Sequence, residues 1–475
     1  MATKRDLVEA HQFSRRRLIT AFVSGAPGGR EVEPARPGRA LVGGLALALL
    51  VVAGGAVTGL ISGRDEADWK QPGLVISKDR GQAYVISTPD DDEVVIRPVI
   101  NITSARLILG SEAEPTYVSE RAINAEKIGE PIGILNAPAN VPDESDLVES
   151  GWTACTSAES GLRLTLTRRP GVTPAPGAGF VVENRGVRYV IAPSGVPARS
   201  GGGEQTGAYA YALPADPGVQ DNLLRDLGLG VGADAAKVTT EWLALWPVGG
   251  ALEWETFGIS GAGRPAPYAG GSSGIPTRAR VGDIVTTPAE SVVLAEEGPR
   301  PLDAFALAVL RSSSIDGRPV RELEAQRIGV GRLSPDRGTH WPEATLVPAR
   351  GEHCAELSAE AGRAPVVALG VGPAASASSL EVPVRQRAVT VVAGGGAYVL
   401  SGSWADSDDG SPYLVDSNGV TYPLVGPDAA ANLGFEGFRA PVVPDSWVKL
   451  FDEGVNLSVA DALCPPVRPS GKPCE

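Results

Sequence analysis

The stretch GQAYVI at residues 81–86 recurs twice further along the chain, as GVRYVI at 186–191 and GGAYVL at 395–400. Each copy has the form Gly-x-x-Tyr-Val-(Ile/Leu) and follows a short apolar run and a glycine-bearing turn, which is the pattern of a β-hairpin. A degenerate fourth copy, SVVL at 291–294, follows the apolar run DIV at 283–285. The copies lie 105, 103 and 106 residues apart, measured between Tyr84, Tyr189, Val292 and Tyr398. This regular spacing predicts four repeat modules.

A tryptophan motif supports the same register. W-x-x-L-W-x-x-G-x-x-L, starting at Trp242, recurs as W-x-x-L-F-x-x-G-x-x-L, starting at Trp447 and therefore displaced by 205 residues, or two periods. Short helices are expected between hairpin and motif, at 219–227 and 428–433. Each module is thus predicted to be a small α+β unit.

The repeat motifs leave gaps that predict a fifth domain. We expect the modules at 62–149, 179–252, 281–340 and 387–463, followed by a tail at 464–475. The stretches 150–178, 253–280 and 341–386 would then form a discontinuous, mainly-β central domain. Because connectors such as 171–177 are rich in glycine and proline, the modules are expected to be splayed out into an elongated body.

The charge of the chain excludes one class of function and divides the molecule in two. The 475 residues carry a net charge of −14 and have a pI near 4.9, which argues against nucleic-acid binding. Residues 1–61 hold eight basic and four acidic side chains, so the rest of the chain carries −18. A basic head precedes a strongly acidic body.

An apolar segment separates the head from the body. Residues 41–61, LVGGLALALLVVAGGAVTGLI, contain neither a charge nor a proline. Twenty-one residues span about 31 Å as a helix, which matches the hydrocarbon core of a bilayer. Because the basic residues precede this segment, the positive-inside rule places residues 1–40 in the cytoplasm and the body outside. The sequence therefore predicts a single-pass protein of the cytoplasmic membrane, rather than one with a cleaved or twin-arginine signal.

The cytoplasmic head is predicted to form a helix over about 7–23, because the glycines and proline of 25–29 are a strong stop signal. Leu18 and Phe22 would share one face of it, beside an arginine cluster. Such a helix can lie on a membrane surface or against a partner protein, and docking to a partner is the favoured interpretation. The candidate docking residues are Phe13, Arg15, Arg16, Arg17, Leu18 and Phe22.

The four cysteines, Cys155, Cys354, Cys464 and Cys474, all lie in the body, where an oxidising compartment permits disulfides. Three pairings are open. Pairing Cys155 with Cys354 would connect distant parts of the proposed central domain and stabilise it by about 4 kcal/mol or more on the chain-entropy model. Pairing Cys464 with Cys474 would close a short loop in the tail. The alternative is free thiols or a metal site, which the lack of a Cys-x-x-Cys motif disfavours.

No constellation of catalytic residues stands out. The Gly-x-Ser-x-Gly match at 270–274 lies in a loop, without the strand and helix of a nucleophile elbow. His340 and His353 lack metal-ligand spacing and are expected to be structural. The acidic runs 90–93 and 406–409 are interpreted as solvated loops rather than calcium sites, and Gly471-Lys472-Pro473 does not complete a phosphate-binding loop. We therefore expect no enzyme activity, cofactor or metal.

Several features together closely resemble the EccB family, the membrane component of actinobacterial type VII (ESX) secretion systems. They are the N-terminal pattern of 2–6 with Gln12-Phe13 and Arg15-Arg16-Arg17, one apolar span after the linker RPGR, and the hairpin repeats with RPVIN at 97–101 after the first. The resemblance covers nearly the whole chain. It implies a cytosolic helix, one span, and an outer body of four modules around a central domain whose disulfide would fall on Cys155 and Cys354.

The resemblance also implies a function and partners. The expected function is that of a structural core subunit of a secretion complex that projects from the cytoplasmic membrane into the periplasm. Expected partners are an EccC-like ATPase, EccD-like and EccE-like membrane subunits and further copies of this chain. The family's repeats are similar to phage-lysin wall-binding modules, so the alternative is a membrane-anchored peptidoglycan-binding or wall-processing protein.

Overall fold

The computed structural model describes residues 4–24, 69–87, 95–111, 113–139, 141–156, 161–194, 198–200, 203–205, 207–231, 235–334, 340–372 and 382–467. The chain divides into two compact units, 1–68 and 69–475. In the first unit the predicted helix is confirmed as α1 (Lys4–Ser24). The predicted span at 41–61 lies outside the described residues. Of the helices within the described ranges, none is both long and apolar enough to cross a membrane.

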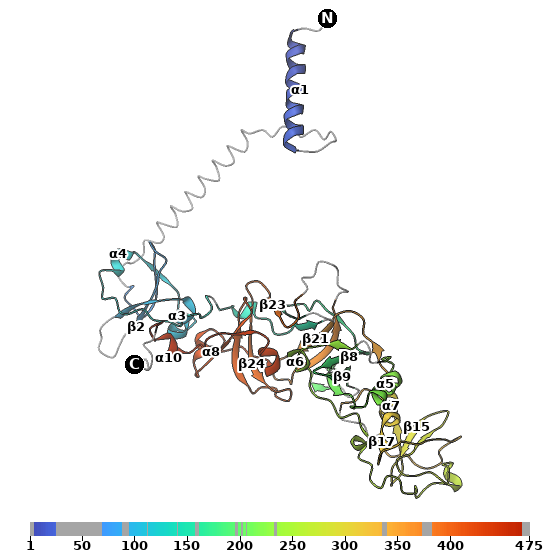
Figure 1. The fold of residues 1–475 in the computed structure, drawn as a ribbon. Coiled ribbons are helices and arrows are strands. Elements are labelled where there is room, and N and C mark those ends of the chain that lie inside the picture. Colours follow the sequence, from blue (N-terminus) through green and yellow to red (C-terminus); the bar gives the residue numbers. More distant parts are fainter. Residues whose placement is uncertain are drawn as a thin grey trace. The chain divides into compact units, whose positions relative to one another are not determined.

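In the second unit, the first module forms a four-stranded sheet in the order β3-β2-β1-β4. Figure 1 labels β2 of this sheet and the helices α3 and α4 beside it. The predicted hairpin is confirmed, with Leu74 opposite Val85. Asn101 caps the helix that follows β3 by accepting a hydrogen bond from Ser104 N at 2.8 Å. The elements are β1 (Gly73–Ser77), β2 (Ala83–Ser87), β3 (Val95–Val99), α3 (Ile102–Leu109), β4 (Thr116–Val118) and α4 (Glu120–Ile123).

The second and third modules repeat this plan. Their predicted hairpins are confirmed as β8–β9 and β14–β15, and the predicted helix at 219–227 is α5. The second contains β8 (Ala178–Asn184), β9 (Val187–Pro193), β12 (Ala208–Ala212), α5 (Pro217–Asp226), β13 (Ala236–Lys237), α6 (Thr240–Leu243) and β20 (Val347–Pro348). The third contains β14 (Ile284–Thr286), β15 (Ser291–Leu294), β16 (Pro299–Leu302), α7 (Ala304–Ser312), β17 (Ser314–Ile315), β18 (Arg318–Pro319) and β19 (Glu322–Glu324).

The fourth module corrects one predicted hairpin. Its strand β24 pairs with β25 and β27, not with the apolar run 389–392 that precedes it. That run belongs to β23 (Arg387–Val391), which pairs with the central sheet. The module contains β24 (Ala397–Gly402), β25 (Ser411–Val415), β26 (Val420–Pro423), α8 (Ala429–Asn432), β27 (Val442–Pro444), α9 (Asp445–Val448), β28 (Asp452–Glu453) and α10 (Val459–Ala462).

The central sheet has six strands in the order β23-β6-β5-β21-β22-β7. They come from 152–174 and 353–391: β5 (Trp152–Thr156), β6 (Leu162–Leu166), β7 (Thr173–Pro174), β21 (His353–Ser358), β22 (Val366–Val371) and β23. The third expected segment, 253–280, contributes no strand to this sheet. Instead, Ala266, Ile275 and Ala279 pack on the third module, in one core with Val285 and Leu294. This part of the expected central domain was therefore wrong.

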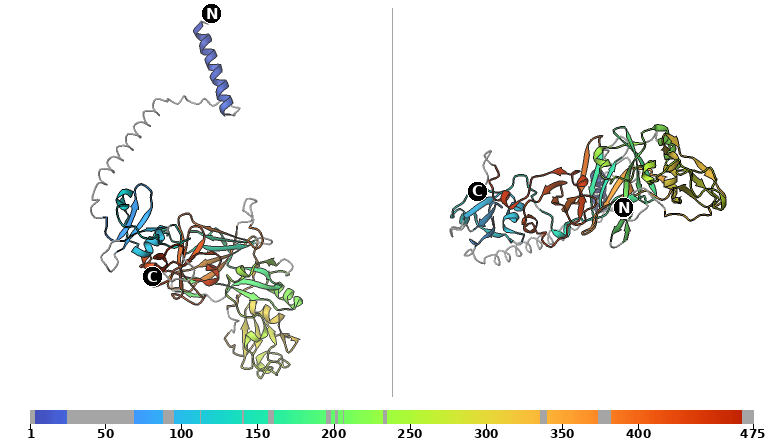
Figure 2. Two further views of the ribbon diagram at one scale, coloured as in Figure 1. Left: turned by 60° about the vertical axis from the view of Figure 1, so that its left-hand side comes forward. Right: turned by 90° about the horizontal axis from the view of Figure 1, so that it is seen from below.

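Shared hydrophobic cores connect neighbouring sheets of the second unit. One core joins residues of the first and fourth modules, including Leu107 and Leu433. The largest joins the fourth module, the central sheet and the second module. Another joins the second module to the third. Figure 2 shows these neighbours from two further sides. The central sheet therefore lies between the second and fourth modules.

Candidate functional site

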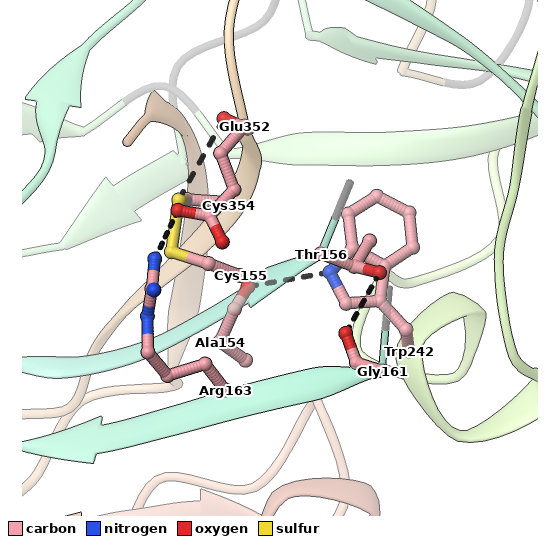
Figure 3. Close-up of a disulfide and its surroundings, with 8 residues drawn as sticks. All are labelled: Ala154, Cys155, Thr156, Gly161, Arg163, Trp242, Glu352 and Cys354. Atoms are coloured by element: carbon pink, nitrogen blue, oxygen red, sulfur yellow. Dashed lines mark hydrogen bonds and ion pairs between the residues drawn. A yellow bond between two sulfur atoms is a disulfide. The ribbon is translucent and has the colours of Figure 1, made fainter. Parts of the chain in front are cut away.

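A disulfide between Cys155 and Cys354 joins the two halves of the central sheet (Figure 3). The two residues lie directly opposite each other on the antiparallel strands β5 and β21, with Cα atoms 4.0 Å apart. Their sequence separation is 199 residues, and both side chains are buried. The bond therefore connects distant parts of the chain within the sheet that lies between the second and fourth modules.

An ion pair lies next to this bond. Arg163, opposite Cys155 on β6, contacts Glu352, which precedes β21 (Figure 3). The Glu352 carboxylate and both sulfurs lie within 4.8 Å of one another, a grouping that resembles a metal site. Because the sulfurs are bonded to each other and Arg163 binds the carboxylate, thiolate ligands are not available here. The grouping is a structural junction.

His353 connects the central sheet to the second module. Its ring stacks on Phe180 of β8, with centroids 4.2 Å apart and planes 8° from parallel. Burial lowers the pKa of His353 to about 4, although a hydrogen bond from the ring to the backbone of Gly351 opposes the shift. The imidazole is therefore neutral at pH 7 and serves as a packing group.

The repeated tryptophans pack into the core around the same sheet. Trp242 in α6 and Trp447 in α9 are both fully buried in the core that they share with the central strands. Trp242 Nε1 donates a hydrogen bond to the Ala154 carbonyl at 3.2 Å (Figure 3), whereas Trp447 Nε1 has no partner within the described residues. The tryptophan spacing predicts only the register of the repeat. Its recurrence in two modules is the signal in the sequence that both contact the same domain.

Helix α1 has several exposed large apolar side chains. Leu7, Leu18 and Ile19 are each more than half exposed within their unit. At 100° per residue, Leu7 and Leu18 lie within 20° of each other, and position 22 lies 40° further round. Phe13, 65% exposed, points about 140° away from Leu18. Of the candidate docking positions, 18 and 22 are therefore neighbours around the helix axis, whereas Phe13 lies on another side. Arg15, Arg16 and Arg17 are exposed.

The remaining predicted residues are only partly described. Cys464 is disulfide-bonded, but Cys474 lies outside the described residues, so the pairing of these two stays a prediction. The loop at 270–274 contains a short 3-10 turn, Gly271–Ser273. It lacks the strand-turn-helix geometry that a nucleophile elbow requires.

Comparison with known proteins identifies relatives over nearly the whole chain. The family model described as type VII secretion system ESX-1, transport TM domain B, matches residues 1–466. A protein of Mycolicibacterium smegmatis (strain MKD8), named ESX-1 secretion system ATPase EccB1, is 27% identical over 467 residues, covering 90% of this chain and 87% of the relative. ESX-3 secretion system ATPase EccB3 of Mycobacterium tuberculosis (strain ATCC 25618 / H37Rv) is 26% identical over 422 residues, covering 78% and 73%.

Two solved structures share the fold. A chain in the structure of an intact ESX-5 inner membrane complex matches with a TM-score of 0.58 and 20% identity, over 100% of this chain and 97% of that one. A chain in the structure of an EccB3 dimer from the ESX-3 core complex matches with the same TM-score and identity, over 82% and 100%. At this identity the likeness establishes a common fold.

Proposed function

This chain belongs to the EccB family of type VII secretion system components, and from that premise we propose that it is a structural core subunit of such a complex, anchored in the cytoplasmic membrane by one helix at 41–61. The observation that carries the proposal is the family match over residues 1–466. Its head would lie in the cytoplasm and its body in the periplasm, as the asymmetry of basic residues around 41–61 indicates.

The body provides the architecture for this role. Neighbouring sheets share hydrophobic cores, and the central sheet is crosslinked by Cys155–Cys354. Such a body holds contact surfaces at set positions outside the membrane. An EccC-like ATPase, EccD-like and EccE-like subunits and further copies of this chain are its proposed partners. Chains of the same fold occur in the structures of an intact ESX-5 inner membrane complex and of an EccB3 dimer from the ESX-3 core complex, which supports that proposal.

The second part of the proposal concerns catalysis. The relatives are named as ATPases, but we propose that this chain hydrolyses no ATP. A phosphate-binding loop needs Gly-x-x-x-x-Gly-Lys-(Ser/Thr), and the sequence offers only Gly471-Lys472-Pro473 near its end. The ATPase of the complex would then be the EccC-like partner.

Affinity purification of the tagged full chain from gently solubilised membranes is expected to recover an ATPase and a multi-spanning subunit. The variant Leu7→Ser/Leu18→Ser/Phe22→Ser is expected to lower that recovery at least about tenfold, because each lost side chain removes about 2 kcal/mol of apolar burial at an interface. The chain itself should stay in the membrane fraction. Quantitative mass spectrometry of the eluates measures both.

Phe13→Ser is the matched control, because it removes an exposed apolar side chain from another sector of α1. It should leave recovery within about twofold. If replacing Arg15, Arg16 and Arg17 with glutamine releases the partners while the serine variant retains them, the helix attaches electrostatically instead, at about 1 kcal/mol per basic residue. Repeated recovery of the chain alone contradicts the proposed function.

Purified full chain is expected to hydrolyse ATP no faster than a preparation from cells that lack the gene. Phosphate release, followed with and without magnesium, measures this. If ATP hydrolysis is observed and one point substitution in this chain abolishes it, the chain is an ATPase without a phosphate-binding loop and the proposal is wrong. Activity that separates from the chain during gel filtration belongs to a contaminant and leaves the expectation standing.

A further inference from the structure

A cavity of about 1050 Å³ lies between the second module and the segment that leads into β23. Three cations from different segments of the chain line it. Arg185 lies in the turn between β8 and β9, Lys237 in β13, and Arg385 in the segment 382–386. Arg387 stands at one end of the cavity, and we call the whole the basic groove. These residues are distant in sequence, so the fold alone gathers them.

The three cations lack an ion-pair partner within the described part of the chain, and Arg185, Lys237 and Arg385 are exposed. Other arginines of the body are paired, among them Arg321 with Asp283 and Arg311 with Glu322. Since the body carries a net charge of −18, carboxylates are abundant around it. A gathering of unpaired cations therefore indicates a site that receives negative charge from outside.

The backbone at two of these positions is also unusual. Arg185 has φ +50° and is followed by Gly186 at φ +82°, so both central residues of this two-residue hairpin turn have positive φ. Asparagine, aspartate or glycine is favoured at the first position of such a turn. Arg385 has φ +68°. Both arginines thus occupy a conformation that costs energy for a residue with a Cβ, which favours a role for their side chains.

The basic groove is too large for a single small anion, and its lining combines charged with apolar residues. One carboxylate or phosphate fills only a small part of about 1050 Å³. Val384, which is exposed, adds apolar surface to the lining, and Glu241 adds one negative charge. Arg387 also lines a neighbouring cavity of about 510 Å³, so the path continues towards the fourth module. Phosphate sites gather converging donors, whereas these cations come from a turn, a strand and a separate segment of the chain.

We propose that the basic groove binds an extended acidic segment of a partner protein, with carboxylates on Arg185, Lys237 and Arg385 and a small apolar side chain on Val384. An extended segment presents successive carboxylates along its length, so that one segment can meet all three cations. That the partner is another subunit of the complex rests on the proposed function. The arrangement of cations in the groove does not depend on that function.

The test uses the full chain in detergent and two labelled octapeptides, (Glu-Ala)4 and (Gln-Ala)4. Fluorescence anisotropy at low ionic strength is expected to show tighter binding of (Glu-Ala)4, and 0.5 M salt should abolish it because exposed charges are screened. Arg185→Glu/Arg385→Glu is expected to weaken binding about tenfold or more, since two attractions become repulsions.

The matched control is Arg121→Glu/Arg318→Glu. It reverses two exposed cations, on α4 and β18, that also lack an ion-pair partner among the described residues. The change in net charge is identical, so this variant should bind (Glu-Ala)4 within about twofold of the native chain. Circular dichroism should show both variants folded as the native chain is.

Three outcomes overturn the proposal: equal binding of the two peptides, equal loss of binding in the control variant, and competition by inorganic phosphate as effective as that by unlabelled (Glu-Ala)4. The last result assigns the groove to small anions. If the peptide fails to bind while partner subunits still co-purify, only the groove proposal fails. If the peptide binds and no subunit co-purifies, only the proposed function fails.

Discussion

The free energy of unfolding of the double variant Cys155→Ala/Cys354→Ala is expected to be about 5 kcal/mol lower than that of the native chain. The bond closes a loop with a sequence separation of 199 residues, and the chain-entropy model gives about 5 kcal/mol for a loop of that length. The effect arises mainly in the unfolded chain, because β5 and β21 still pair through their backbones in the folded state. Denaturant unfolding, followed by tryptophan fluorescence, measures it.

Trp152, one of the eight tryptophans of the chain, reports on the central sheet, because it is fully buried on β5 three residues before Cys155. The control is the native chain unfolded in a reductant, which should approach the double variant. A loss below about 1 kcal/mol would show that the unfolded chain is already constrained, or that the folded sheet is strained by the bond. The chain-entropy account of this crosslink would then be wrong.

Trp242→Ala is expected to lower the free energy of unfolding by about 3–5 kcal/mol, the usual range for a fully buried aromatic residue. The indole has no exposed surface, lies 5.4 Å from the Trp246 ring, and donates to the Ala154 carbonyl of β5. Its removal leaves a cavity between the second module and the central sheet and removes a hydrogen bond across that contact. Urea unfolding of the full chain in detergent provides the measurement.

The repeat supplies a matched control for the hydrogen bond. Trp242→Phe removes a bonded N–H, whereas Trp447→Phe removes an N–H with no partner in the described part of the chain. We expect Trp242→Phe to cost about 1 kcal/mol more than Trp447→Phe, the usual net value of one hydrogen bond. Equal costs would mean that packing alone holds the second module to the central sheet. A loss under about 1 kcal/mol for Trp242→Ala would rule out that contact as a major one.

Both expected losses of stability arise in the central sheet, which the second and fourth modules contact. Phe451, at the position of the fourth module that corresponds to Trp246, packs edge-on against Trp152 with centroids 5.5 Å apart. The same motif of two different modules therefore meets the same central strands. Weakening either contact should separate surfaces that the proposed function requires at set positions.

Local features of the fold were predictable. The hairpins β1–β2, β8–β9 and β14–β15 follow from apolar runs that flank a short turn, and their paired strands are near in sequence. The helix α5 is signalled by Asp216, whose side chain accepts a hydrogen bond from Val219 N, and by Pro217 in the first turn. The tryptophan spacing likewise predicted that the second and fourth modules are related.

The groove and the junction at His353 could not be predicted. Arg185 and Arg385 are 200 residues apart in sequence, and neither lies in a recognisable motif. The stacking of His353 on Phe180 joins residues of two sheets. No local sequence pattern predicts such contacts, because each depends on how folded sheets pack against each other.

The sequence by itself predicted the hairpins of the first three modules and α1, because each depends on turn chemistry or periodicity within about twenty residues. The span at 41–61 stays a prediction. Tertiary structure alone decided that β23 pairs in parallel with β6 and that 253–280 packs on the third module. It also joined Cys155 to Cys354, a pairing that cysteine positions left open and the family resemblance implied. The physical reason is that parallel pairing, core packing and crosslinking are settled by which distant surfaces bury most apolar area together.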